Sequence, residues 1–260
     1  MSSSGFFRTL RIFFLLMILV GVAIGTWATK SRTTSWKDPL WVVVYPVNGD
    51  GSRTSSQYIA VLDKEIFRSV ERFIEWEARR YSLPLKRPLV IRLGPTVHDL
   101  PPAPPEDRTV WKIMVWSLKL RYWAYRVDTY RGPPRDIRIF VQYFDPSVHK
   151  QLSESLGLQK GMICVAKAFA SQRMEKENNI VIAHELLHTV GATDKYDLSN
   201  NQPVYPEGYA EPGKIPLFPQ EKAEIMAGRI PLSKSRADMP VDLARVVIGE
   251  KTAREIRWIE

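Results

Sequence analysis

Hydrophobic residues along the chain follow two patterns in turn, which predict alternating strands and helices. Short runs rich in β-branched residues are typical of buried strands, and apolar residues spaced by three and four are typical of helices. The predicted strands are residues 40–47, 88–94, 136–144 and 162–170. The predicted helices are residues 55–81, 109–127, 178–190, 241–248 and 250–258. Such alternation indicates a single α+β (or α/β) domain built around a mixed sheet.

An uncharged apolar run of 17 residues, IFFLLMILVGVAIGTWA at 12–28, follows a basic N-terminus. Its length is at the short end of what spans a bilayer. We therefore predict a cytoplasmic segment at 1–11, a transmembrane anchor at 12–28, a polar tether at 29–39 and one domain at 40–260. This topology places the domain outside the inner or plasma membrane. The alternative is a cleaved signal sequence, which would make the protein periplasmic or secreted.

Composition changes this picture little. The formal charge of +9 suggests nucleic acid, but residues 1–32 contain four basic residues and no acid, leaving 33 basic and 28 acidic residues elsewhere. The remaining excess is spread along the chain, so no nucleic-acid partner is predicted. Because Cys164 is the single cysteine, no intrachain disulfide or cysteine-based zinc cluster can form. We expect Cys164 to be a buried, inert thiol and His149 to be an ordinary surface histidine.

The segment NNIVIAHELLHTVGATDKYD, residues 178–197, contains two of the four histidines. His184 and His188 are four residues apart, so on a helix they share a face at the spacing that two imidazoles need to bind one zinc ion. Glu185, about 100° round the helix, would reach a water on the metal rather than the metal itself. Apolar residues on nearly every face predict that this helix is buried. A buried glutamate is costly unless a cation lies nearby.

The residues after this helix offer a third ligand. Gly191 can adopt the left-handed conformation that ends a helix, which lets the chain turn back so that Asp194 faces the same metal. Asp197 is a weaker competitor. A thermolysin-like layout, with Glu207 or Glu211 as the third ligand, is the rival interpretation, although proline and glycine around both glutamates disfavour a helix there.

Together these residues form H-E-x-x-H-x-x-G-x-x-D, which resembles the motif of the metzincin metallopeptidases in their snapalysin-like variant. The resemblance covers about residues 178–230. It implies a zincin-like catalytic domain in which His184, His188 and Asp194 hold one zinc ion above a methionine-containing turn. AEIMAGRIP offers Met226 for that turn, although no tyrosine follows it closely.

The expected function is a zinc-dependent endopeptidase acting on a protein or peptide substrate. Three protein ligands leave one position for water, whose pKa the metal lowers, and Glu185 would be the general base. Tyr205 and Tyr209, in the following loop, are the candidate donors to the oxyanion. Two alternatives are an inactive zinc-binding scaffold and a membrane-tethered binding protein in which the histidine motif is accidental. The aromatic residues of helix 109–127 are expected to belong to the core.

Overall fold

The computed structural model describes residues 34–107, 109–152, 156–158 and 162–260, and of the first 33 residues only 11, 13, 14, 16 and 17. Within the described residues, no helix is both long and apolar enough to cross a membrane. Most of the predicted cytoplasmic segment at 1–11 and most of the predicted anchor at 12–28 lie outside the described residues, so both stay predictions.

A five-stranded mixed sheet forms the centre of the domain, as the strand pattern predicted. Its order is β2-β1-β3-β5-β4, in which the first four strands are parallel and β4 pairs antiparallel with β5 at the edge. The strands are β1 (Leu40–Asn48), β2 (Leu89–Leu93), β3 (Ile137–Phe144), β4 (Leu156–Leu158) and β5 (Ile163–Phe169). The four parallel strands agree with their predicted ranges to within one residue at each end, whereas β4 was not predicted.

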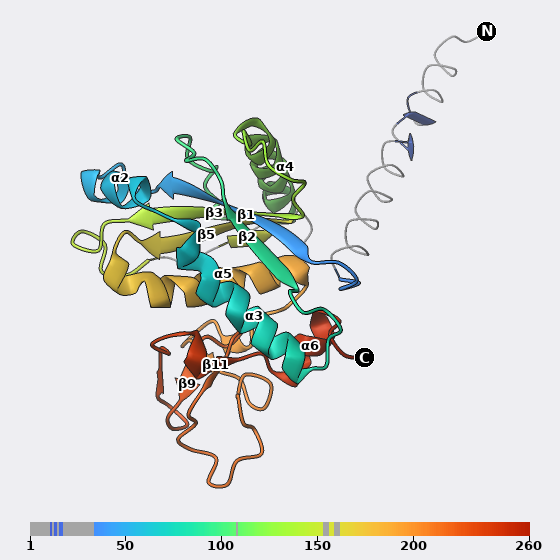
Figure 1. Ribbon diagram of the computed structural model, residues 1–260, viewed down its shortest axis with the longest axis vertical. Coiled ribbons are helices and arrows are strands. Elements are labelled where there is room, and N and C mark those ends of the chain that lie inside the picture. Colours follow the sequence, from blue (N-terminus) through green and yellow to red (C-terminus); the bar gives the residue numbers. More distant parts are fainter. Residues whose placement is uncertain are drawn as a thin grey trace.

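Helices cover both faces of this sheet (Figure 1). Helices α3 (Arg68–Arg80) and α5 (Glu175–Val190) lie on one side, and α4 (Val110–Arg126) lies on the other. Alternate residues of β1 join the two layers, since Val42 packs in the core with α3 and α5, whereas Val43 packs with Leu120 and Trp123 of α4. The core is therefore double, with the sheet between its halves.

The prediction of one continuous helix at 55–81 was wrong. The chain forms α2 (Arg53–Ala60), then the 3₁₀ helix η1 (Lys64–Phe67) and α3. Between them, the Asp63 side chain accepts a hydrogen bond from Glu65 N at 2.8 Å. Such local capping competes with a continued helix.

The C-terminal region also differs from its prediction. Residues 241–248 do not form the predicted α-helix. They contain a short 3₁₀ helix, η3 (Leu243–Arg245), followed by the strand β11 (Val246–Val247). β11 pairs parallel with β8 (Ala223–Glu224), a long-range pairing that suits its two β-branched residues. The last predicted helix is shorter, α6 (Glu250–Glu255). The remaining elements are the 3₁₀ helix η2 (Gln172–Met174) and the strands β6 (Tyr196–Asp197), β7 (Gln202–Pro203), β9 (Ile230–Pro231) and β10 (Ala237–Asp238).

Helix α4 occupies its predicted range, but only part of its aromatic content is core. Trp123 is buried, and Trp116 is half-buried with its Nε1 donating to Pro102 O at 2.8 Å. Trp111 and Tyr122 are exposed instead, which corrects the expectation that the aromatics of this helix pack inside.

Candidate metal centre

Helix α5 carries the histidine motif and packs against β5, on the same side of the sheet as α3. Its interior residues are buried on most sides, as the apolar sequence predicted. It ends at Gly191, whose φ of 118° is left-handed and whose N–H caps the last turn by donating to Leu187 O and His188 O. A Cβ at Gly191 would also lie 3.3 Å from Glu255 O. The predicted role of this glycine is confirmed, and it turns the chain toward Asp194.

The two histidines of α5 are oriented by backbone carbonyls. His184 Nδ1 donates to Ile225 O at 2.9 Å, and His188 Nδ1 donates to Ala192 O at 2.9 Å. A carbonyl oxygen can only accept, so Nδ1 of each neutral ring carries the hydrogen and each Nε2 presents a lone pair. The two Nε2 atoms lie 3.0 Å apart.

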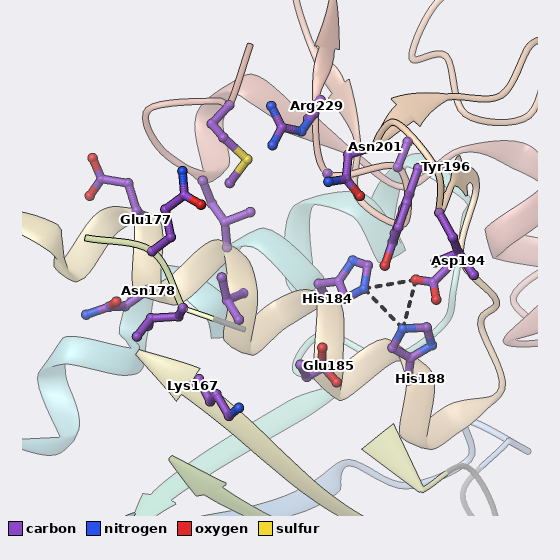
Figure 2. Close-up of a pocket in the computed structure, with 18 of the residues that line it drawn as sticks. Lys167, Glu177, Asn178, His184, Glu185, His188, Asp194, Tyr196, Asn201 and Arg229 are labelled. Atoms are coloured by element: carbon purple, nitrogen blue, oxygen red, sulfur yellow. Dashed lines mark hydrogen bonds and ion pairs between the residues drawn. The ribbon is translucent and has the colours of Figure 1, made fainter. Parts of the chain in front are cut away.

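Asp194 completes this cluster. Its Oδ1 lies 3.2 Å from His184 Nε2 and 3.1 Å from His188 Nε2, as Figure 2 shows. Three acceptor atoms, the two Nε2 atoms and Asp194 Oδ1, therefore converge on one point. When both rings are neutral, none of the three can donate a hydrogen to another, so the arrangement favours a bound cation. At a zinc–ligand distance of about 2 Å, tetrahedral ligand atoms lie roughly 3.3 Å apart. The three atoms are close to that spacing, so these residues fit a zinc ion.

Electrostatics point the same way. Burial alone would lower the pKa of His184, but a protonated ring would donate a hydrogen bond to Asp194 and lie near the Glu185 carboxylate, and these interactions outweigh burial and raise that pKa. Burial alone would raise the pKa of Asp194, but hydrogen bonds and attraction from protonated His184 and His188 would hold that pKa well below its usual range. Positive charge at this point is thus favoured.

Glu185 lies beside the histidines and is almost fully buried, with 5% of its surface exposed. Ligand atoms of His184, Glu185 and His188 fall within 4.8 Å of one another. Burial raises the pKa of Glu185, and the two histidines only partly oppose that rise. The buried Cys164 thiol donates to Glu185 Oε2 at 3.8 Å. The expected burial of Cys164 is confirmed, while its contact with Glu185 was not foreseen.

A turn after β8 supports His184 from below. Ile225 supplies the carbonyl that His184 binds, and Met226 is fully buried next to it. Glu224, also fully buried, accepts four hydrogen bonds. The donors are Met226 N at 2.6 Å, Ala227 N at 3.0 Å, Gly249 N at 3.1 Å and Thr252 Oγ1 at 2.7 Å. Glu224 thereby joins this turn to the start of α6.

Glu255 holds the loop that carries Asp194. It accepts from Thr193 N at 2.9 Å, from Thr193 Oγ1 at 2.8 Å and from Lys195 Nζ at 2.8 Å. The Lys195 side chain is 3% exposed, so its ammonium depends on this carboxylate for charge compensation. Both neighbours of Asp194 are thus attached to α6.

Replacing Glu255 with glutamine is expected to lower the free energy of unfolding by about 1.5–3 kcal/mol at neutral pH, because Lys195 loses a charged acceptor. Burial would raise the pKa of Glu255, but hydrogen bonds from Lys195 and Thr193 lower it in the folded chain. This stabilisation is therefore present above the unfolded pKa of about 4.3 and is lost as the pH falls through the folded value.

Urea unfolding of both proteins across a pH series measures this effect. The difference between wild type and Glu255→Gln should shrink in acid. Glu250→Gln, which removes an exposed partner of Arg254 on the same helix, is the control and should cost under about 1 kcal/mol. A difference that stays constant down to strong acid would contradict the assignment.

The cluster opens into a cleft of about 1200 Å³. Its lining combines the three acceptor residues and Glu185 with side chains that the motif did not identify. These are, among others, Trp116, Lys150, Lys167, Glu177, Tyr196, Asn201, Arg229 and Met239. Figure 2 shows the Tyr196 side chain reaching toward His184 and Asp194. The one signal for Tyr196 in the sequence is its position two residues after Asp194.

Other sequence candidates lie elsewhere. Tyr205 is exposed and its hydroxyl donates to Pro212 O at 3.4 Å, while the ring of Tyr209 packs against Tyr205. Neither tyrosine lines the cleft. Asp197 caps a local turn by accepting from Ser199 N at 2.8 Å, and Glu207 and Glu211 lie outside the cleft lining. The structure brings together His184, Glu185, His188 and Asp194, and Met226 is buried next to Ile225, whose carbonyl contacts His184.

Comparisons with known proteins add no family. No protein-family model matches the chain, and no curated protein matches it. Among solved structures, the chain is similar to the crystal structure of wild-type OgpA from Akkermansia muciniphila, with a TM-score of 0.35 and 11% sequence identity. The match covers 83% of this chain and 61% of that chain, so it spans less than two thirds of OgpA. A likeness this weak carries no argument about fold or function. Any interpretation of the site therefore depends on its own side chains.

Proposed function

We propose that this protein is a zinc-dependent endopeptidase of the metzincin type, with Glu185 as its general base. The observation that carries the proposal is the convergence of His184 Nε2, His188 Nε2 and Asp194 Oδ1 within 3.0–3.2 Å of one another beside a buried glutamate. His184, His188 and Asp194 would hold one zinc ion, with Met226 in the turn below. The apolar run at 12–28 would tether the domain outside the membrane.

In this mechanism the zinc ion and the side chains of the protein would have different roles. Zinc, when bound, would polarise the scissile carbonyl and lower the pKa of a nearby water molecule. Glu185 would accept a proton from that water and return it to the leaving amine. Its raised pKa suits both steps, because a carboxyl that binds a proton more readily than usual can also deliver it. Tyr196, rather than Tyr205 or Tyr209, would donate to the developing oxyanion, because of the three only Tyr196 lines the cleft.

The cleft supports a polypeptide as substrate. Its volume of about 1200 Å³ exceeds the roughly 300–1,000 Å³ typical of small-molecule sites. Its walls come from segments as distant in the sequence as Pro104 and Met239. A chain bound through such a cleft would extend past the reacting bond in both directions, which favours endopeptidase action.

The experiment that tests the function combines metal content with proteolysis. The purified full chain is expected to contain one zinc per molecule and to release new peptide termini, identified by mass spectrometry, from a mixture of unfolded proteins. A chelator should abolish this release, and added zinc should restore it. Zinc binding without any new termini would favour the alternative, an inactive zinc-binding scaffold.

Asp194→Ala identifies the third ligand. Its affinity for zinc is expected to fall by more than the roughly 10–100-fold that loss of an outer-shell partner costs, because a direct ligand is removed. Glu207→Ala, which removes the rival ligand, should keep wild-type zinc content. Dialysis against buffered zinc followed by metal analysis measures both. Loss of zinc in Glu207→Ala alone would sink the Asp194 assignment.

A further inference from the structure

Helix α4 is apolar on two opposite faces, although it has a protein neighbour on only one of them within the described residues. Leu120, Trp123 and Ala124 are buried against the sheet. The other face exposes large apolar side chains, with Trp111 71% exposed and Leu118 66% exposed. In Figure 1, α4 lies on the opposite side of the sheet from α3 and α5. A contiguous exposed apolar face commonly marks an interaction site, so we expect a partner on the outer face of α4.

The outer residues form a continuous stripe. Five exposed apolar residues follow one another at spacings of three, four, four and three: Trp111, Met114, Leu118, Tyr122 and Tyr125. At 100° per residue they fall within an arc of about 80°. This stripe is one ridge along the whole helix rather than a set of scattered residues.

Positive charges flank the stripe. Lys112, Lys119 and Arg126 recur every seven residues along one side of it, and Arg121 lies on the other side. Lys112 and Arg126 also form exposed ion pairs with Asp107 and Asp99, with which anionic headgroups would compete. The sequence of α4, VWKIMVWSLKLRYWAYR, contains no aspartate or glutamate. An acid in its first turn would favour the helix dipole, yet that turn has none and carries Lys112. The absence of acids therefore does not serve the stability of the helix itself.

We propose that the outer face of α4, the Trp111–Tyr125 stripe with its basic flanks, binds the surface of an anionic lipid bilayer. Tryptophan and tyrosine, with an apolar body and a polar tip, suit the boundary between lipid tails and headgroups. Lysine and arginine beside them would approach anionic headgroups while their stems remain on apolar surface. A convex ridge fits a deformable lipid surface without a shaped groove. This proposal is independent of the metal site.

The position of α4 relative to the start of the domain is compatible with this partner. After α4 the chain continues to Asp136, whose N–H donates to Trp41 O at 2.8 Å near the start of β1. Only residues 29–33 separate the apolar run from the described domain. Five residues span at most roughly 18 Å. A bilayer that holds the run would therefore lie close to the start of the domain.

Site-directed spin labelling of the full chain tests this proposal. Cys164 is fully buried, so Leu118→Cys adds one accessible thiol, and Trp76→Cys, on the exposed side of α3, is the matched control with 70% exposure. The protein is reconstituted in vesicles of phosphatidylcholine with phosphatidylglycerol. The label at 118 should become more accessible to oxygen and less accessible to a water-soluble nickel complex. The label at 76 should stay accessible to the nickel complex.

A second part of the experiment tests whether binding depends on charge. The shift at position 118 should decrease in vesicles of phosphatidylcholine alone and in a Lys119→Glu background. The proposal is overturned if the label at 118 remains as accessible to nickel as the label at 76. It is also overturned if the label is shielded from oxygen and nickel alike, because that pattern indicates a protein partner on α4.

Discussion

Replacing Glu185 with glutamine is expected to slow peptide hydrolysis by about 10²–10⁴-fold, the usual contribution of a general base. Zinc content should not change, because the three acceptor atoms come from His184, His188 and Asp194. Glutamine keeps the size and shape of the side chain but cannot accept the proton of a water molecule. The rate of product formation at saturating substrate, compared at equal zinc occupancy, measures this effect.

The same variant should be at least as stable as the wild type when metal is removed. Burial raises the pKa of Glu185 in the folded chain, so the ionised form costs stability above that pKa. A neutral glutamine removes this cost. Thermal unfolding of both chelated proteins at neutral pH should show an equal or higher midpoint for Glu185→Gln.

Glu175→Gln is the matched control. Glu175 lies at the start of the same helix, outside the cleft, so its substitution should leave hydrolysis nearly unchanged. Full activity of Glu185→Gln at normal zinc content would disprove its role as base. Loss of zinc in that variant would instead indicate that Glu185 is a ligand, which its distance from the histidines also permits.

Glu224→Ala is expected to lower the free energy of unfolding by about 3–5 kcal/mol. Four donors, from Met226, Ala227, Gly249 and Thr252, lose their acceptor inside the core, and each buried donor without a partner is costly. The turn that presents Ile225 O to His184 would also lose its attachment to α6. Zinc affinity should therefore fall together with stability.

Glu224→Gln should be destabilising as well, despite its similar shape. One end of the glutamine amide is an NH₂ group, which would face N–H or O–H donors at either position of the carboxylate. Urea unfolding, together with zinc titration, measures both variants. Glu221→Ala is the control, since the Glu221 side chain is 73% exposed and pairs with Lys214 at 3.5 Å. A Glu224→Gln protein as stable as the wild type would contradict the four-bond arrangement.

Several features of the site were predictable because they depend on residues within a few turns of one another. His184 and His188 share a face at a spacing of four residues, and Gly191 ends the helix with the expected positive φ. Asp194 follows at a distance that a single turn can close. The four parallel strands were predictable for the same reason, since a buried parallel strand is a continuous run of β-branched residues.

Other features depend on contacts between distant segments. Glu224 meets Gly249 and Thr252, and Glu255 meets Thr193 and Lys195 across about sixty residues. No local pattern marks these glutamates as different from exposed ones. The strand β11 was predicted as part of a helix, because its pairing with the distant strand β8 leaves no signal in the local sequence.

The sequence by itself thus determined the four parallel strands, the range of α4, the burial of α5 and the identity of the acceptor residues. Only the tertiary structure decided which tyrosine lines the cleft, which glutamates hold its loops, and that the outer stripe of α4 lacks cover among the described residues. The physical reason is the distance along the sequence over which each interaction acts. Periodicity and capping act within one or two helical turns, whereas burial and hydrogen bonding of loops are settled by segments that the fold brings together.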